Sequence, residues 1–226
     1  MEGYLVFFIV LENNYFFKGR DCWISMNKFF IYGFGHNAKK FAWNYVHNKF
    51  FNELEFVGFV DDAEKGEYLG FPILGDNKVF NNLKKRGINN VFVTLLKNPR
   101  RRLEKCLELE NKGFKFPNFI QNNFSGEVNF KGVYIDETSK FLGVDFNLGD
   151  FSLIGPYSTI EGKSTLGKGA IVSPYSFVGY NSGIGDGSVL YPYAGIAPNK
   201  KIGKFCIIGP KVFQKQHLGD GKISKQ

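Results

Sequence analysis

The chain has 226 residues, of which 43% are hydrophobic and 22% charged, as is ordinary for soluble globular proteins of one large or two modest domains. Its net charge of +8 is compatible with nucleic-acid binding, but the lysines are scattered and no basic motif alternates with aromatic residues. A protein that handles phosphorylated small molecules explains the charge equally well, so we expect no nucleic-acid partner. Three widely spaced cysteines (Cys22, Cys106 and Cys206) provide neither a disulfide framework nor a metal-ligand cluster, which predicts a cytoplasmic protein without a metal site.

The first 25 residues differ from the rest of the chain. Their apolar stretch "YLVFFIVL" is too short to span a bilayer, and Glu2 precedes it where a signal peptide carries positive charge. Met26 stands directly before the first convincing strand. We therefore interpret residues 1–25 as an N-terminal extension that follows a mis-set start codon, and we expect no membrane span.

Residues 26–120 alternate between strand-like and helix-like segments. The apolar runs predict strands at 28–33, 55–60 and 90–96. Helices are predicted at 37–48, at 77–86 behind an Asp76 cap, and from the pair Asn98-Pro99 to Gly113. The first helix has one apolar face, made of Ala38, Phe41, Ala42, Tyr45 and Val46. With 114–120 leading out, the β-α-β-α-β-α-β order predicts a small Rossmann-like parallel sheet with helices on its faces.

A glycine motif lies between the first strand and the first helix. The stretch "GFGHNA" (33–38) matches G-x-G-x-x-A, in which Gly33 and Gly35 let the backbone approach a phosphate at a helix N-terminus. A tight turn without a ligand is the alternative. Asp61 and Asp62 end the second strand, where such folds place a carboxylate that binds a ribose or a base. A solvated turn explains these two residues equally well.

Three arginines, Arg100, Arg101 and Arg102, occupy the first turn of the third predicted helix. Positive side chains oppose the helix macrodipole at this end, and a bound anion would relieve the conflict. Because the cost at an exposed site is only about 0.3–1 kcal/mol, we interpret the arginines as a solvated basic face.

Within residues 121–226, which we expect to form the second domain, an aliphatic residue stands at every sixth position from Leu142 to Ile208. The run comprises Leu142, Leu148, Ile154, Ile160, Leu166, Val172, Val178, Ile184, Leu190, Ile196, Ile202 and Ile208. A glycine that eases the turn follows many of them, and a small residue such as Ser176 or Cys206 stands two positions before. Each hexad is therefore a short strand with one small and one aliphatic residue directed inward, which predicts a parallel β-helix. An ordinary β-sandwich would space its strands by 8–12 residues.

The combination of these two domains resembles the bacterial hexapeptide-repeat sugar acyltransferases, specifically the sialic-acid O-acetyltransferase and UDP-amino-sugar N-acetyltransferase family. The resemblance covers about residues 28–212 and depends on "IYGFGHNAKKFA", "FVGFVDD", "LGFPILGD", "NNVFVTLLKNPRRR" and the hexads. It implies a left-handed β-helix and a homotrimer that binds acetyl-coenzyme A between neighbouring helices. The implied activity is acetyl transfer to an amino or hydroxyl group of a nucleotide sugar in bacterial surface-glycan biosynthesis.

The resemblance also assigns substrate-binding residues. It implies that the nucleotide is held by Gly33, Gly35, His36, Asn37, Asp61 and Asp62, with Asn98 and Arg101 nearby. His36 and Asn37 stand where this family has Gly and His, and Leu96 replaces a glycine that gives the ligand room.

The catalytic positions depart from the family pattern. Family members carry a His base and an acidic orienter four and three residues before the Ile-Gly pair, but Pro198 and Asn199 stand there in this chain. Proline cannot accept a proton, so the base is unidentified. His217, beyond the regular hexads, is a weak candidate, and the β-helix is shorter at its C-terminus than those of relatives. Two alternatives stay open: an impaired relative that retains trimerisation and nucleotide binding, and an NAD-dependent enzyme, which the glycine motif alone would suggest.

Overall fold

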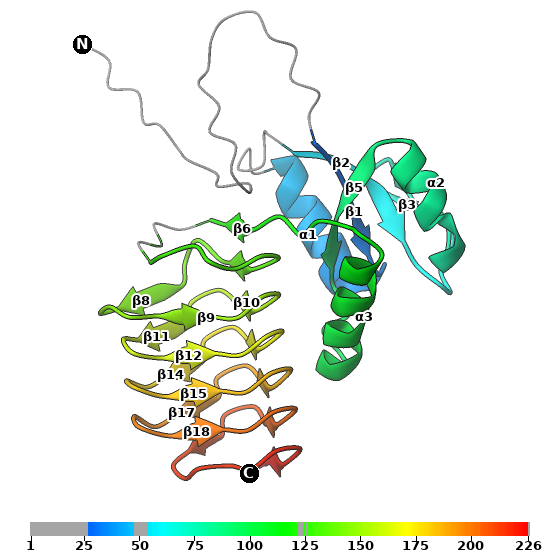
Figure 1. The fold of residues 1–226 in the computed structure, drawn as a ribbon. Coiled ribbons are helices and arrows are strands. Elements are labelled where there is room, and N and C mark those ends of the chain that lie inside the picture. Colours follow the sequence, from blue (N-terminus) through cyan, green and yellow to red (C-terminus); the bar gives the residue numbers. More distant parts are fainter. Residues whose placement is uncertain (1–26, 48–53, 122–123, 125, 226) are drawn as a thin grey trace, which may run out of the picture.

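The computed structural model describes residues 27–47, 54–121, 124 and 126–225 (Figure 1). The predicted extension at 1–25 therefore lies outside the described residues. None of the helices in these ranges is long and apolar enough to cross a membrane.

The front domain is a three-stranded parallel sheet with helices around it. The strand order is β2-β1-β5, and the strands are β1 (Asn27–Tyr32), β2 (Leu54–Val60) and β5 (Ile88–Val93). The helices are α1 (His36–His47), the 3-10 turn η2 (Asn77–Val79), α2 (Phe80–Lys85) and α3 (Pro99–Asn111). The first three predicted strands and the three predicted helices of this domain are confirmed, although the third strand ends at Val93. The predicted caps at Asp76 and Asn98 are confirmed as well.

Two predictions about the front domain are wrong. Val46 is 48% exposed, because the buried face of α1 consists of Ala38, Phe41 and Ala42. Segment 114–120 does not form a fourth strand of this sheet. It makes one bridge at Lys115 and continues into β6 (Phe119–Ile120), which pairs with the solenoid. A short hairpin of β3 (Glu67–Tyr68) and β4 (Phe71–Pro72) was not predicted.

The second domain is a parallel β-helix with three flat faces, stacked coil upon coil (Figure 1). The first face contains β6, β7 (Tyr134–Ile135), β10 (Leu153–Ile154), β13 (Ile171–Val172), β16 (Val189–Leu190), β19 (Ile207–Ile208) and β21 (Ile223–Ser224). The second face contains β8 (Lys140–Leu142), β11 (Thr159–Glu161), β14 (Phe177–Val178), β17 (Gly195–Ile196) and β20 (Phe213–Gln214). The third face contains β9 (Asn147–Leu148), β12 (Thr165–Leu166), β15 (Gly183–Ile184) and β18 (Lys201–Ile202).

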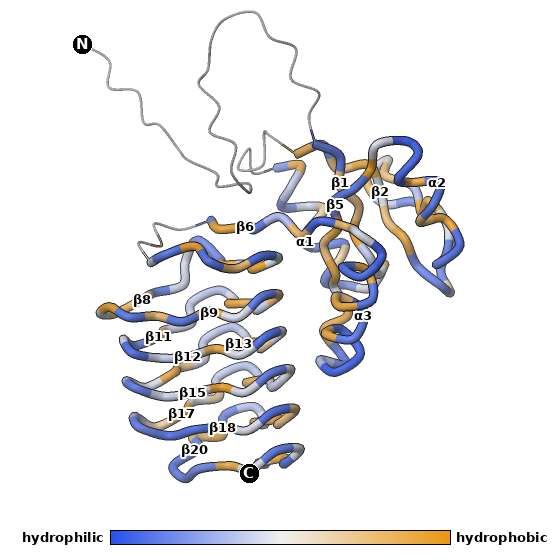
Figure 2. The backbone as a smooth tube through the Cα atoms, in the orientation of Figure 1, coloured by the Kyte–Doolittle hydropathy of each residue, from blue (hydrophilic) through white to orange (hydrophobic). Residues whose placement is uncertain are grey.

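The hexad pattern sets the register of the central coils and shifts at both ends. Hydrophobic stretches recur at the same place in successive coils (Figure 2). The predicted first inward residue, Leu142, is wrong: it is 53% exposed, and Phe141 instead pairs with Ile160. One extra residue in the following turn, before Leu148, causes this shift. At the other end, Ile202 pairs with Leu218, so the last coil is shorter than the others.

The glycines that follow the inward aliphatic residues are needed for a different reason from the predicted one. Gly149 and Gly185 have no left-handed φ, but a Cβ at either would lie within 2.6 Å of backbone atoms in the next coil. These glycines therefore allow the coils to stack closely. The left-handed backbone occurs two residues later, at the corners.

Three columns of corner residues, with φ between +53° and +66°, separate the three faces. The first corner, between the third and first faces, contains Phe151, Gly169, Gly187 and Phe205. The second corner, between the first and second faces, contains Tyr157, Tyr175, Tyr193 and Lys211. The third corner, between the second and third faces, contains Asp145, Lys163, Asn181 and Asn199.

The front domain packs on the first face and along the first corner. Phenylalanines of the front domain share one apolar cluster with the first face, formed by Phe41, Phe92, Phe119, Leu153, Ile171 and Val189. Arg102 of α3 is fully buried between the domains, where its Nε donates to the Val93 carbonyl (3.0 Å) and its Nη1 to the Phe151 carbonyl (2.7 Å). The predicted solvated basic face is therefore wrong for Arg102, because its guanidinium joins the two domains.

Candidate functional site

The two glycines of the loop after β1 differ in the space around them: Gly33 has no room for a side chain, and Gly35 has. Gly33 has a φ of +103°, and a Cβ there would lie 2.8 Å from Thr94 Oγ1, so this position requires glycine. Gly35 has no atom within 4 Å of its Cβ position, and its carbonyl accepts the first helical hydrogen bond, from Lys39 N. Because glycine supplies no capping side chain, the first-turn amides of α1 are not capped by it and are available to an anion.

The two predicted aspartates hold the loop in shape. Asp61 Oδ2 accepts from Phe34 N (2.8 Å), and its Oδ1 accepts from Ala63 N and Glu64 N (both 3.0 Å). Asp62 accepts from the Tyr32 hydroxyl (2.7 Å) and from Asn77 N (3.2 Å). Both carboxylates thus have structural partners, and each oxygen that has a single partner can still accept from a ligand.

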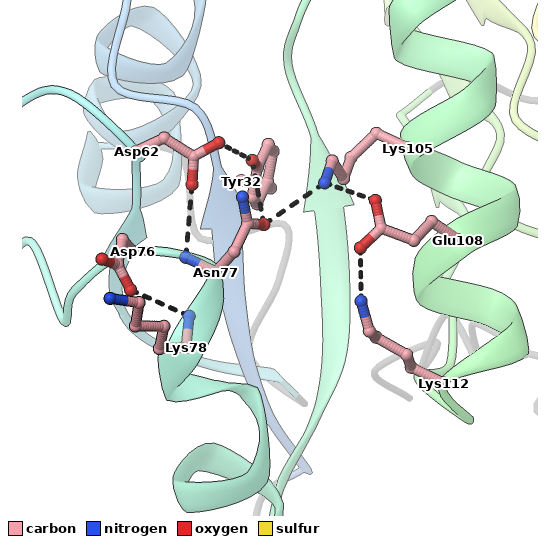
Figure 3. Close-up of polar contacts among 8 residues, drawn as sticks. All are labelled: Tyr32, Asp62, Asp76, Asn77, Lys78, Lys105, Glu108 and Lys112. Carbon is pink, nitrogen blue, oxygen red and sulfur yellow. Dashed lines mark hydrogen bonds and ion pairs between the residues drawn. The ribbon is translucent and has the colours of Figure 1, made fainter.

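A polar network connects the end of β2 with α3 (Figure 3). Burial raises the pKa of Tyr32, and the hydrogen bond to Asp62 raises this pKa further, so the hydroxyl keeps its proton and donates it. Asn77 Oδ1 lies 3.2 Å from the Tyr32 hydroxyl oxygen and accepts from Lys105 Nζ (3.2 Å), and Lys105 pairs with Glu108. This network, which was not predicted from the sequence, ties the carboxyl ends of β1 and β2 to η2 and α3.

A hollow of about 410 Å³ lies beside the glycine loop, over the exposed face of α1. Its lining comprises His36, Lys39, Lys40, Trp43, Asn44 and Tyr68. Lys39 Nζ lies 4.3 Å from the centre of the Phe34 ring, and Trp43 stacks on His47. Lys39 and Trp43 were not predicted as site residues, although their i, i+4 spacing places them on one helix face.

The remaining front-domain candidates lie at the start of α3 and of α1. Asn98 is the N-cap of α3 and accepts from Arg101 N (3.0 Å), while the Arg101 side chain is exposed. Asn37 is half-buried in the first turn of α1. Leu96 packs partly buried against the front-domain core. All the predicted substrate-binding residues therefore follow the carboxyl ends of β1, β2 and β5, the edge at which parallel α/β sheets bind ligands.

Pro198 and Asn199 lie elsewhere in the chain, at the third corner of the solenoid. Both are exposed, and Asn199 Oδ1 accepts from Asn181 Nδ2 (2.8 Å) in the coil before. The third corner joins the second and third faces, whereas the front domain covers the first face. The structure therefore does not bring the two groups of predicted residues together within one chain.

His217 is held by the backbone in a way that opposes a role as base. Its Nδ1 accepts a hydrogen bond from Lys201 N (3.1 Å). In a neutral imidazole the other nitrogen then carries the proton and has no free lone pair. His217 can act as a base in this geometry only after this hydrogen bond breaks. Among the described residues, no three His, Cys, Asp or Glu side chains are placed to hold a metal ion.

Solved structures share the whole two-domain arrangement. The chain is similar to PerB from Caulobacter crescentus in complex with CoA and GDP-perosamine, with a TM-score of 0.77, 22% identity, and coverage of 88% of this chain and 94% of that one. It is also similar to the acetyltransferase domain of PglB from Neisseria gonorrhoeae (TM-score 0.75, 21% identity, 87% and 95% coverage). WeeI from Acinetobacter baumannii is a third similar structure (TM-score 0.57, 17% identity, 86% and 94% coverage).

These likenesses confirm the predicted fold class, a Rossmann-like parallel sheet followed by a left-handed parallel β-helix of hexapeptide repeats. No protein-family model matches the sequence, and no curated protein matches it either.

Proposed function

We propose that this protein is an acetyltransferase that moves an acetyl group from acetyl-coenzyme A to an amino or hydroxyl group of a nucleotide-linked sugar. One observation carries the proposal: an open glycine loop at a helix N-terminus and a hexapeptide β-helix occur in one chain, in the arrangement of PerB bound to CoA and GDP-perosamine. The PglB domain, which has been solved with acetyl-coenzyme A, supports the same co-substrate.

The front-domain residues supply the nucleotide site in this proposal. Gly35 and the first turn of α1 receive the diphosphate, together with the exposed Arg101 side chain. The hollow lined by Trp43 and Tyr68 offers aromatic surface to a nucleobase. Asp61 and Asp62 accept hydrogen bonds from the ribose or the base with the capacity that their structural partners leave free.

The site requires more than one copy of the chain. The third corner, which carries Pro198 and Asn199, does not adjoin the front domain of its own chain. A nucleotide sugar bound by one front domain therefore reaches the third corner of a neighbouring copy. A homotrimer, with acetyl-coenzyme A between neighbouring solenoids, satisfies this requirement.

An impaired relative remains the second candidate function, and Pro198 is the observation that favours it. The residue that stands at the expected base position is exposed and has no proton-accepting side chain. Loss of a general base typically lowers a rate by about 10²–10⁴-fold. Such a protein would still bind the nucleotide and would still assemble.

Calorimetry on two Gly35 variants tests the nucleotide site. Asp at a helix N-cap stabilises a helix, so Gly35→Asp should fold while placing a negative charge where the diphosphate binds. We expect Gly35→Asp to weaken binding of UDP- and GDP-linked amino sugars at least about tenfold, because like charges near a protein surface repel by more than 1.4 kcal/mol. Gly35→Ala, the matched control, should bind within about threefold of wild type.

A thiol-release assay with acetyl-coenzyme A and the nucleotide amino sugars then measures transfer. Release that depends on both substrates supports the acetyltransferase. Nucleotide binding without release favours the impaired relative. Tighter binding of NAD than of any nucleotide sugar would contradict both.

A further inference from the structure

The second face of the solenoid is apolar, and the described residues of the front domain do not cover it. With the exception of Ile223, the exposed large hydrophobic side chains of the described solenoid residues lie on this face or at the two corners that bound it; they are Leu142, Val144, Tyr157, Tyr175, Tyr180, Tyr193 and Phe213. The first face is also apolar, but the front domain packs on it. The exposed strand positions of the third face carry no large apolar side chain. A contiguous exposed apolar patch of this kind marks an interaction surface.

The aromatic side chains of this surface form regular rows. At the second corner, the rings of Tyr157, Tyr175 and Tyr193 (the tyrosine column) stack on one another with ring centres 4.9 Å apart. On the face itself, the ring of Phe213 stacks on that of Phe177 at 6.3 Å. Side chains that are ordered before binding lose little conformational entropy when they are buried, so these rows favour association.

A second copy of this chain fits these rows. The ring spacing of the tyrosine column equals the distance between adjacent strands of a sheet, which is the rise of one coil. A neighbouring solenoid of the same sequence repeats at the same interval, so the two surfaces match coil by coil. Charged side chains stand at the ends of this surface and at the third corner, as a polar rim does; they are Lys140, Lys211, Asp145, Glu161 and Lys163.

The two corners of the second face have different neighbours. The second corner also borders the first face, which carries the front domain. The third corner carries Pro198 and Asn199. In a ring of identical copies, each contact joins two unlike surfaces. The second corner of one copy, set against the third corner of the next, therefore brings the front domain of the first copy beside Pro198 of its neighbour.

We propose that the second face is the contact surface between copies of this chain, with the tyrosine column of one copy packed against Val144 and Tyr180 of the next. This inference rests on the proposed function and adds the surface through which one copy completes the site of another. A single chain holds the nucleotide edge and the third corner apart, so the site is incomplete without this contact.

Light scattering on Tyr175→Lys/Tyr193→Lys tests the surface. Lysine suits the backbone of this column, because Lys211 has a similar left-handed φ of +62° there. We expect the wild type to form trimers and this variant to dissociate at a protein concentration at least about hundredfold higher, because two charges would be buried within the contact. Val144→Lys, at the opposite edge, should weaken the trimer independently. The matched control, Val46→Lys/Ile223→Lys, adds two charges at exposed apolar residues away from the second face and should remain trimeric.

Two further measurements separate dissociation from unfolding and from the proposed activity. The far-UV circular dichroism of the variants should equal that of the wild type, and nucleotide-sugar affinity should change by less than about threefold, because the nucleotide edge is distant from the substitutions. A monomeric wild type, or folded variants as trimeric as the control, would overturn this inference. Thiol release by a monomeric wild type would leave the proposed function standing. A wild-type trimer that dissociates as expected but releases no thiol would overturn the acetyltransferase and leave the contact surface.

Discussion

The hydroxyl groups of the inward serines of the solenoid form hydrogen bonds with backbone groups of neighbouring turns. The Ser188 hydroxyl donates to the Gly203 carbonyl (2.6 Å) and accepts from Cys206 N (2.8 Å). Ser176 and Ser182 likewise donate to carbonyls fifteen residues further on. Small size alone would allow alanine at these positions, as at Ala170 and Ala194. The serine hydroxyls therefore supply hydrogen bonds to turn carbonyls that the strands leave without a partner.

Replacing Ser188 tests this contribution. Ser188→Ala should lower the free energy of unfolding by about 1–3 kcal/mol, because it leaves a buried carbonyl and a buried amide without their partner. Ser152 provides the matched control: it is fully buried at an equivalent inward position, but its hydroxyl has no hydrogen-bond partner among the described residues. Ser152→Ala should change stability by less than about 0.5 kcal/mol or increase it. Urea denaturation measures both, and equal losses would contradict the argument.

Residues whose role is local were predictable from the sequence, and residues whose role is tertiary were not. The caps Asp76 and Asn98 were predicted because a cap depends on neighbours within three positions. Arg102 was misassigned because its partners, the carbonyls of Val93 and Phe151, come from another strand and another domain. The Tyr32 network was missed for the same reason.

At the scale of elements, α3 determines how the two domains meet. Leu103 of α3 lies against the first corner, where a Cβ at Gly169 would be 3.0 Å from Leu103 Cδ1. Phe151 and Phe205 occupy the same column above and below, so the glycines there mark the contact with the helix. Arg100 also places its guanidinium 4.6 Å from the centre of the Phe205 ring.

Alanine substitutions at two glycines with left-handed φ separate the contribution of helix docking from that of backbone strain. Gly169 and Gly221 have nearly equal left-handed φ values, +66° and +67°, but a Cβ at Gly221 meets no atom within 4 Å. Gly221→Ala should cost about 1–2 kcal/mol of stability from the backbone alone. Gly169→Ala should cost about 1–3 kcal/mol more, because the new methyl group displaces Leu103. Equal costs in urea denaturation would show that α3 does not pack closely on this corner.

The strand register of the solenoid was predictable from the sequence in the central coils but not at the two ends. The hexads fix which residues point inward in the central coils, because a strand of period two leaves no other choice. They do not reveal the extra residue after Phe141 or the shortened last coil. Turn length is set by contacts between coils, and a six-residue pattern gives no information about it.

At the scale of the whole molecule, the carboxyl edge of the front sheet and the third corner of the solenoid lie on different sides of the chain. The front domain covers the first face, and its Arg102 joins it to the Phe151 turn, so the two domains have a fixed relation. Domain closure within one chain would have to break these buried contacts. The proposed assembly of several copies would bring the two sites together without breaking these contacts.

Complementation between two inactive variants tests the shared site. Gly35→Asp weakens nucleotide binding, and Pro198→Trp places a bulky side chain at the exposed third corner, so each protein alone should show little turnover at a subsaturating concentration of nucleotide sugar. If a site combines the front domain of one copy with the third corner of another, trimers formed by co-expression should regain about a quarter of the wild-type activity, because about one site in four then has both parts intact. The control is the double variant Gly35→Asp/Pro198→Trp on one chain, which should show little turnover on its own. Light scattering must report trimers in every sample. Mixed trimers no more active than the separate variants would show that each chain completes its own site.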